Sequence, residues 1–257
     1  MNRTERLLFL IKYLINENDR YNTLEIPQSN EERFRLYRSL VNVRMPDSIS
    51  DDYLAAEDEY LKSLIDDKGI TDIDTLTESE PDIFIWQGDI TTLRCDAIVN
   101  AANSQMLGCF VPCHACIDNC IHTFSGVRLR IKCDELMKAQ GFEEPTGTAK
   151  ITPAYNLPCK YVIHTVGPIV SGALTKKDCS LLESCYRSCL EIAEENGAKS
   201  IAFCCISTGV FGFPQREAAE IAVKTVRQYK AQTKSDIKVI FNVFKDEDKT
   251  IYENILG

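Results

Sequence analysis

The feature that most constrains the fold is a regular alternation of short apolar runs and longer helical patterns from about residue 82 onward. Strand-like runs occur at "DIFIWQGDI", "CDAIVNAAN", "YVIHTVGP", "SIAFCCIST" and "IKVIFNVF", and helical patterns lie between them at roughly 117–138, 178–196 and 215–231. Strands that alternate with helices of this length predict an α/β domain with a mainly parallel central sheet. We therefore place one α/β domain over residues 82–257.

Residues 1–75 show a helical pattern only. Apolar residues recur at the spacing of one helix face, at Leu7, Leu8, Ile11, Leu14 and Ile15, and the stretches 30–45 and 50–69 have the same character. Ser50 or Asp51 would cap the last of these helices and Gly69 would end it. We expect a helical extension that covers one side of the α/β domain, because a helical pattern alone seldom identifies a function. The alternative is a surface that recognises substrate or a partner.

Charge and composition exclude several classes of protein. The net charge of −9 and the pI of about 5.0 argue against a general nucleic-acid binder, which needs a basic face. No segment reaches the roughly 18 apolar residues of a membrane span. The N-terminal apolar run contains charges and lacks a small-residue cleavage site, so we predict a cytoplasmic protein without a signal peptide. Its 12 cysteines are then expected to be reduced or metal-bound.

The segments that follow the strands are candidates for a ligand site, because α/β sheets bind ligands beyond the carboxyl ends of their strands. In "STGVFGFP", the glycines let backbone N–H groups converge on an anion, unless the segment is an ordinary glycine turn. In "GDIT", Asp89 could accept a hydrogen bond from an exocyclic amine or cap a turn. In "NAAN", Asn103 could bond sugar hydroxyls or close a turn.

The stretch "GCFVPCHACIDNCIH", residues 108–122, concentrates cysteine and histidine. Thiolate and imidazole groups are good zinc ligands, so a metal site is one interpretation. A redox site and a cluster of small buried side chains are the other two.

Together, "GDIT", "DAIVNAAN", "YVIHTVGP" and "STGVFGFP", in this order, resemble the macrodomain family over roughly residues 82–257. The resemblance implies a three-layer α/β/α macrodomain with a mixed, mainly parallel central sheet, preceded here by the N-terminal helical extension. It also implies an ADP-ribose site. Asp89 and the backbone of Ile90 would hold the adenine, with Phe244 beside it, and Asn103 would face the distal ribose. The diphosphate would be wrapped by Ser207, Thr208, Gly209, Val210, Phe211 and Gly212.

The stretch 108–122 resembles a zinc-dependent, sirtuin-associated subgroup of microbial macrodomains, which also carries an N-terminal helical extension. The resemblance implies one zinc ion with Cys109, His114 and Cys116 as ligands, whereas Cys113 and Cys120 do not match ligand positions. Three protein ligands leave a fourth position for water or substrate, as in catalytic zinc sites. With Cys113 as a fourth ligand, the zinc would be structural.

Asp118 stands in the place of the acidic residue of hydrolytic macrodomains. It would orient or deprotonate a water, or else cap a helix, and Asn119 would help to position the distal ribose. We expect His122 to pack or to bond the backbone, and His164 to be a buried structural residue.

The resemblance, together with these residues, implies a zinc-dependent hydrolase that removes mono-ADP-ribose from protein side chains. The resemblance further implies a sirtuin-like ADP-ribosyltransferase as functional partner and a lipoyl-carrier protein, related to that of the glycine cleavage system, as a substrate. Two alternatives stay open. One is a macrodomain that binds ADP-ribose without hydrolysing it and carries a structural zinc, and the other is a redox or zinc sensor.

Overall fold

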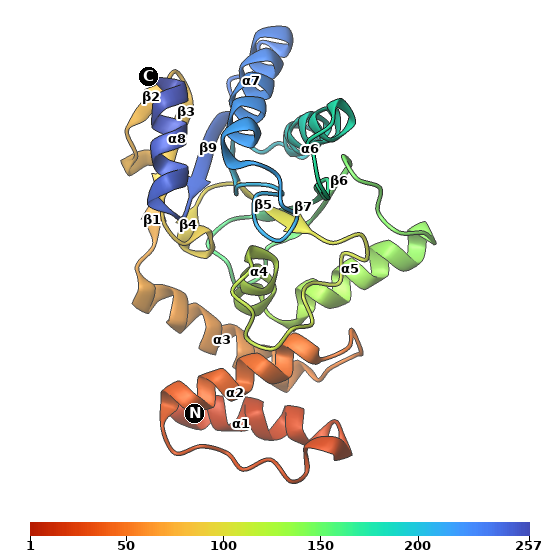
Figure 1. Ribbon diagram of the computed structural model, residues 1–257. Helices are drawn as coiled ribbons and strands as arrows, with labels where there is room; N and C mark the ends of the chain where they lie inside the picture. Colours follow the sequence, from red (N-terminus) through yellow and green to blue (C-terminus); the bar gives the residue numbers. More distant parts are fainter.

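A computed structural model describes all residues of the chain, 1–257. Its N-terminal part is a bundle of three helices at one end of the molecule (Figure 1), formed by α1 (Arg3–Asn16), α2 (Asn30–Val43) and α3 (Asp51–Lys68). A short 3₁₀ turn, Asp19–Tyr21, follows α1. Ser50 caps α3 and Gly69 ends it at φ +83°, as the sequence predicts. The bundle has an apolar core of its own.

A seven-stranded mixed sheet forms the centre of the second part, in the order β2-β3-β9-β8-β5-β7-β6. The five inner strands are mutually parallel: β3 (Ile83–Gln87), β9 (Lys238–Val243), β8 (Ser200–Phe203), β5 (Ala97–Ala102) and β7 (Tyr161–Val166). The edge strands β2 (Glu78–Glu80) and β6 (Ala149–Pro153) are antiparallel to their neighbours. This confirms the predicted mixed, mainly parallel sheet.

Neither edge strand is apparent in the sequence. β2 reads "ESE" and β6 reads "AKITP", so both lack an apolar run, and proline is typical of an edge strand. A separate two-stranded parallel pair joins β1 (Thr71–Asp72) to β4 (Leu93–Arg94). The 3₁₀ turns Ile73–Thr75 and Ile90–Thr92 (η3) follow β1 and precede β4.

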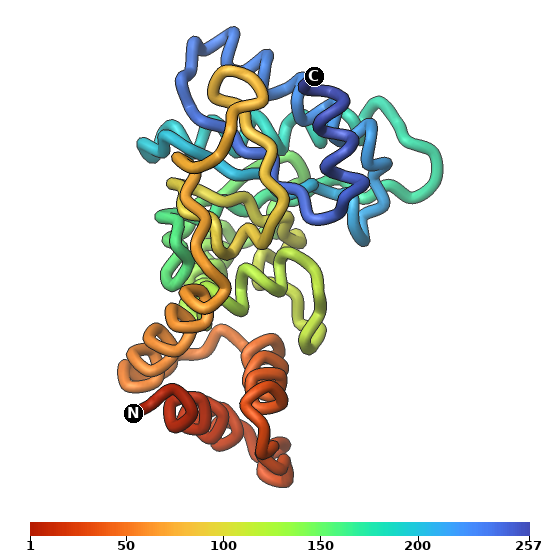
Figure 2. The backbone as a smooth tube through the Cα atoms, turned by 90° about the vertical axis from the view of Figure 1, so that its left-hand side faces the viewer, coloured from red at the N-terminus to blue at the C-terminus, as the bar shows by residue number.

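Helices cover both faces of the sheet, which gives the predicted three layers (Figures 1 and 2). On the face toward the N-terminal bundle lie α4 (Ile117–Ser125) and α5 (Val127–Gln140). On the other face, α7 (Gln215–Thr233) packs between α6 (Lys176–Glu195) and α8 (Asp246–Leu256). No helix of the structure has the length and apolar character that crossing a membrane requires.

The predicted single helix over 117–138 is wrong, because the chain breaks at Gly126. Gly126 adopts φ +94° and ψ 173°, which ends α4 and starts α5. The buried carboxylate of Glu57, from α3, accepts a hydrogen bond from the Val127 N–H at 2.9 Å and thereby caps α5. A Cβ atom at Gly126 would lie 2.6 Å from Glu57 Oε2, so the position requires glycine.

Candidate active site and metal centre

Cys109, His114 and Cys116 bring their ligand atoms together in the loop that precedes α4. These atoms all lie within 4.8 Å of one another, and Cys109 Sγ is 3.6 Å from His114 Nδ1. With Zn–S near 2.3 Å and Zn–N near 2.0–2.1 Å, tetrahedral coordination separates sulfur from nitrogen by about 3.6 Å. The donor set and its spacing therefore fit one zinc ion. We call residues 109–116 the metal loop.

The other two cysteines of the stretch point elsewhere. Cys113 Sγ donates to the Arg35 carbonyl oxygen at 3.4 Å, and the Cys113 N–H donates to Asn42 Oδ1 at 2.9 Å. Cys120 Sγ lies 3.6 Å from Arg38 Nη2. Because the contacts of Cys113 are with α2, the converging group contains three candidate ligands, the number typical of catalytic zinc sites.

The start of α4 holds the metal loop in place. Cys116 is the N-cap residue of α4, where its Sγ accepts a hydrogen bond from the Asn119 N–H at 3.4 Å. The Asn119 Nδ2 group donates to the carbonyl oxygens of Val111 at 3.0 Å and Cys109 at 3.3 Å. Burial raises the pKa of the Cys116 thiol to about 12, and a bound cation would favour its thiolate form.

Asp118 lies on the first turn of α4 and is 5% exposed. Its Oδ1 accepts a hydrogen bond from Asn100 Nδ2 at 2.8 Å. Burial raises the pKa of Asp118 to about 6, against the opposing effect of the Asn100 hydrogen bond. His122 Nε2 lies 3.5 Å from Asp118 Oδ1, but the two do not form an ion pair, because burial lowers the pKa of His122 well below its usual value.

A chain of buried polar groups connects Asp118 to the sheet. Asn100, on β5, donates to Asp118 and also contacts His164 Nδ1 at 3.1 Å, while His164 Nε2 contacts Thr152 Oγ1 at 3.0 Å. Burial lowers the pKa of His164 to about 3, so this histidine is neutral. This confirms the prediction that His164 is buried and bonded. The sequence alone does not mark Asn100 as part of the site, because Asn100 reads as one more residue of a strand.

Asn103 closes the turn that leads into the metal loop. Its Oδ1 accepts hydrogen bonds from the N–H groups of Gln105 and Met106, and its Nδ2 donates to the Gly108 carbonyl oxygen at 3.1 Å. These contacts correspond to the turn-closing alternative for Asn103. The role of Asn103 at the distal ribose stays a prediction, as does that of Asn119, whose side chain is fully buried.

The predicted diphosphate loop follows β8 and ends before α7. Ser207 has φ +65°, and its carbonyl oxygen accepts a hydrogen bond from Phe213 N–H. Gly167 lies against Ser207, since a Cβ atom there would be 2.0 Å from Ser207 Oγ. The loop thus rests on the end of β7, while its tip at Gly209 and Val210 is exposed. The other members are Thr208 and Phe211, both half-buried, and Gly212, which is exposed.

Asp89 lies at the predicted adenine end, at the start of η3. Its Oδ1 accepts hydrogen bonds from the Thr91 N–H at 3.0 Å and hydroxyl at 2.6 Å, so the capping role is present. Its Oδ2 pairs with Lys68 Nζ, from the last turn of α3, at 2.8 Å. Burial raises the pKa of Asp89, but the hydrogen bonds from Lys68 and Thr91 outweigh it and the net direction is down. Ile90 is buried and Phe244 is exposed.

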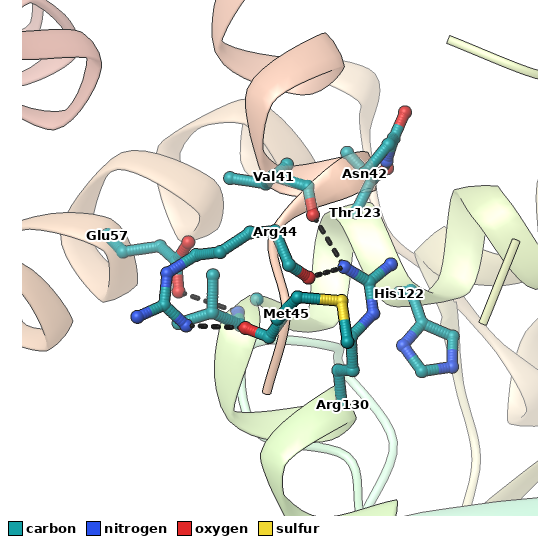
Figure 3. A pocket seen from close by; sticks show the side chains of 10 residues that line it. Val41, Asn42, Arg44, Met45, Glu57, His122, Thr123 and Arg130 are labelled. Carbon is teal, nitrogen blue, oxygen red and sulfur yellow. Dashed lines mark hydrogen bonds between the residues drawn. The ribbon is translucent and has the colours of Figure 1, made fainter. Parts of the chain in front are cut away.

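Three basic residues that the sequence does not single out contact the candidate site or the segments that hold it. Arg38 and Lys68 come from the N-terminal bundle, and Arg130 comes from α5. Arg130 donates to the carbonyl oxygens of Leu107 and Val41 and lines a small cavity between the bundle and α4–α5 (Figure 3). No signal marks these residues in the sequence, because basic side chains on helices are mostly exposed.

Comparison with known proteins agrees with this fold. The Macro domain family matches residues 99–222. A protein-ADP-ribose hydrolase of Treponema medium is 57% identical over 261 residues and is covered completely by this chain. A protein of the same name from Staphylococcus aureus (strain MSSA476) is 50% identical over 250 residues, which span 96% of this chain and 94% of that protein.

A solved structure with the same fold is that of a Trypanosoma brucei macrodomain in complex with ADP-ribose. It aligns with a TM-score of 0.66 at 29% sequence identity and covers 90% of this chain and 97% of that chain. The structural similarity to this macrodomain and the similarity to the Treponema protein along its whole length point to the same family. This chain belongs to the macro domain family, and it is a hydrolase.

Proposed function

We propose that this hydrolase is a zinc-dependent protein mono-ADP-ribosylhydrolase. The observation that carries the proposal is the convergence of Cys109, His114 and Cys116 directly before Asp118, at the N-terminus of α4. The names of the Treponema and Staphylococcus relatives support protein-linked ADP-ribose as the substrate. The complex of the Trypanosoma macrodomain supports an ADP-ribose site in this fold.

The bond cleaved joins C1 of the distal ribose to a protein side chain. A water oxygen bonds to C1 as the bond to the side chain breaks, one water proton passes to a base, and the departing side chain gains a proton. Glycosidic cleavage passes through an oxocarbenium-like state, so positive charge develops on the ribose. Cys109, His114 and Cys116 would hold a zinc ion, which would supply Lewis acidity to the reaction.

Within this scheme, Asp118 acts as the acid/base group. Asn100 fixes its Oδ1, which leaves Oδ2 for the water that attacks C1. Asp89 accepts a hydrogen bond from the exocyclic amine of adenine, and the loop 207–212 places backbone N–H groups around the diphosphate. Asn119 and Asn103 hold the backbone on either side of Cys109 and so keep the distal-ribose end of the site in shape.

We further propose a cytoplasmic setting in which the enzyme reverses the mark of a sirtuin-like ADP-ribosyltransferase on a lipoyl-carrier protein. This part rests on the resemblance of the stretch 108–122 to the sirtuin-associated subgroup. Mass spectrometry of a modified carrier, before and after incubation with the enzyme, tests it. The expected result is loss of the mass of one ADP-ribose, and an unchanged mass would contradict this substrate.

The decisive experiment measures release of ADP-ribose from a mono-ADP-ribosylated protein by the zinc-loaded, chelator-stripped and zinc-reloaded enzyme. We expect release by the loaded enzyme, loss on stripping and recovery on reloading. The Asp118→Ala variant should still bind free ADP-ribose, but it should cleave ADP-ribose from the modified protein orders of magnitude more slowly. Equal rates for stripped and loaded enzyme would refute zinc dependence. Binding without release would instead favour an ADP-ribose reader with a structural zinc.

A further inference from the structure

Helix α2 of the N-terminal bundle makes direct polar contacts with the metal loop and with α4. Arg38 Nη2 donates to the His114 carbonyl oxygen at 2.7 Å and to Asn119 Oδ1 at 2.8 Å. One turn later, Asn42 accepts the Cys113 N–H at 2.9 Å and donates to Thr123 Oγ1 at 3.0 Å. The bundle is therefore attached to both the metal loop and the helix that follows it.

Each of the three zinc ligands is connected to Arg38 through one or two hydrogen bonds. His114 is held through its own carbonyl oxygen. Cys109 and Cys116 are held through Asn119, which donates from Nδ2 to the Cys109 carbonyl oxygen and from its N–H to Cys116 Sγ. Because Arg38 fixes the Oδ1 atom of the same amide, it also fixes which way the Asn119 Nδ2 group points.

The contacts of Arg38 are suited to fixing the relative positions of the groups that it binds. Its acceptors are a carbonyl oxygen, an amide oxygen and, at 3.6 Å, the Cys120 sulfur. A guanidinium is planar and presents donors in fixed directions, so it can hold two acceptors at a defined separation. A lysine ammonium at this position would be a point charge on a flexible stem.

We propose that Arg38 is a positioning residue for the zinc ligands, so that the N-terminal bundle forms the outer support of the metal centre. The inference rests on the proposed zinc-dependent function and extends it to α2. Residues that orient metal ligands from behind typically contribute about 10–100-fold to metal affinity or activity. Arg38 acts on the ligands through Asn119 and the His114 backbone, without touching the ion.

The test compares Arg38→Met, Arg38→Lys and the matched control Arg35→Gln. Arg35 lies on the same helix with an exposed side chain, and it contacts the metal loop only through its backbone carbonyl oxygen, so Arg35→Gln removes one positive charge and keeps that contact. Three quantities are measured on the full chain: the zinc dissociation constant by competition with a chromogenic chelator, amide hydrogen exchange of residues 109–119 in metal-free protein, and kcat and KM for ADP-ribose release.

For Arg38→Met we expect zinc affinity to fall about 10–100-fold, faster exchange across the metal loop, and a loss in kcat that exceeds the change in KM. Arg38→Lys should recover part of each effect, and Arg35→Gln should match the wild type. If Arg38→Met equals Arg35→Gln in zinc affinity and exchange, the proposal is overturned, even if its melting temperature is lower. If Arg38→Met does not fold, Arg38→Lys decides on the same readouts.

The experiment also separates this inference from the proposed function. If the stripped wild type releases ADP-ribose at full rate, zinc dependence fails. Faster exchange of residues 109–119 in metal-free Arg38→Met would then still support positioning by Arg38. If the wild type needs zinc while both Arg38 variants bind and exchange as it does, the function stands and the positioning role is refuted.

Discussion

Replacing Gly126 by alanine tests whether the contact of Glu57 with α5 joins the two parts of the chain. Gly126 has φ +94° and ψ 173°, a region that is essentially restricted to glycine, and forcing another residue into it costs about 1–3 kcal/mol. The added Cβ would lie 2.6 Å from Glu57 Oε2. The carboxylate must then move off the Val127 N–H, and the loss of a hydrogen bond to a charged group costs about 1.5–3 kcal/mol.

Together these contributions predict that Gly126→Ala lowers the free energy of unfolding by about 2.5–6 kcal/mol. The matched control is Gly141→Ala, at the end of α5. Gly141 also has a positive φ, +80°, but a Cβ there would meet nothing within 4 Å. Its cost should be that of the left-handed conformation alone, about 1–2 kcal/mol.

Urea denaturation followed by circular dichroism measures both variants, with the midpoint as the readout as long as the slope is unchanged. We expect the midpoint of Gly126→Ala to fall clearly below that of Gly141→Ala. Equal losses in the free energy of unfolding of the two variants would mean that the Glu57 carboxylate moves without a cost in stability. Glu57 would then not stabilise the start of α5.

Three further predictions concern the site and the residues around it. Cys116→Ser should weaken zinc binding in a chelator competition by at least an order of magnitude. Cys113→Ser should bind zinc like the wild type, because the Cys113 sulfur contacts α2, and an equal loss in both variants would place Cys113 among the ligands. Asp89→Ala should weaken ADP-ribose binding by roughly 10–150-fold in calorimetry, because a hydrogen bond to a charged group contributes about 1.5–3 kcal/mol. Lys68→Met should change the affinity less than about tenfold, because the Lys68–Asp89 pair is partly exposed. The reverse ranking would contradict the assignment of Asp89 to the adenine. Asp96→Asn should be less stable than the wild type at pH 7. Burial raises the pKa of Asp96, but hydrogen bonds from Lys160 and the Lys199 N–H outweigh it and lower the pKa overall, so the stabilisation is complete above the ordinary pKa near 3.8 and is lost as the pH falls through the lowered value. A difference in urea midpoints between variant and wild type that does not shrink below pH 4 would refute this assignment.

The parts of the fold that sequence could predict are those with local causes. Ser50 and Gly69 bound α3 because a cap and a left-handed terminus depend on residues within one turn. The inner strands follow from apolar runs that are buried on both faces of the sheet. The break at Gly126 has a distant cause, since the residue that requires it is Glu57 on another helix.

The candidate site divides in the same way. Cys109, His114 and Cys116 stand close together in the sequence, so their convergence could be anticipated from spacing and family resemblance. Arg38 and Lys68 come from helices whose pattern predicts only an amphipathic bundle, and their partners lie in segments far along the chain. Such contacts depend on how the bundle docks, which periodicity does not specify.

The docking of α5 also affects how the chain can be divided. Val127 is part of the apolar core of the N-terminal bundle, although it follows the residues that form the sheet edge and the metal loop. A fragment that begins at residue 82 would expose Val127, leave its N–H without Glu57, and free one side of Arg130. The boundary between residues 75 and 82 is thus a boundary along the chain but not in the packing. The hydrolase should be expressed, truncated or fused to other proteins with its first 75 residues in place.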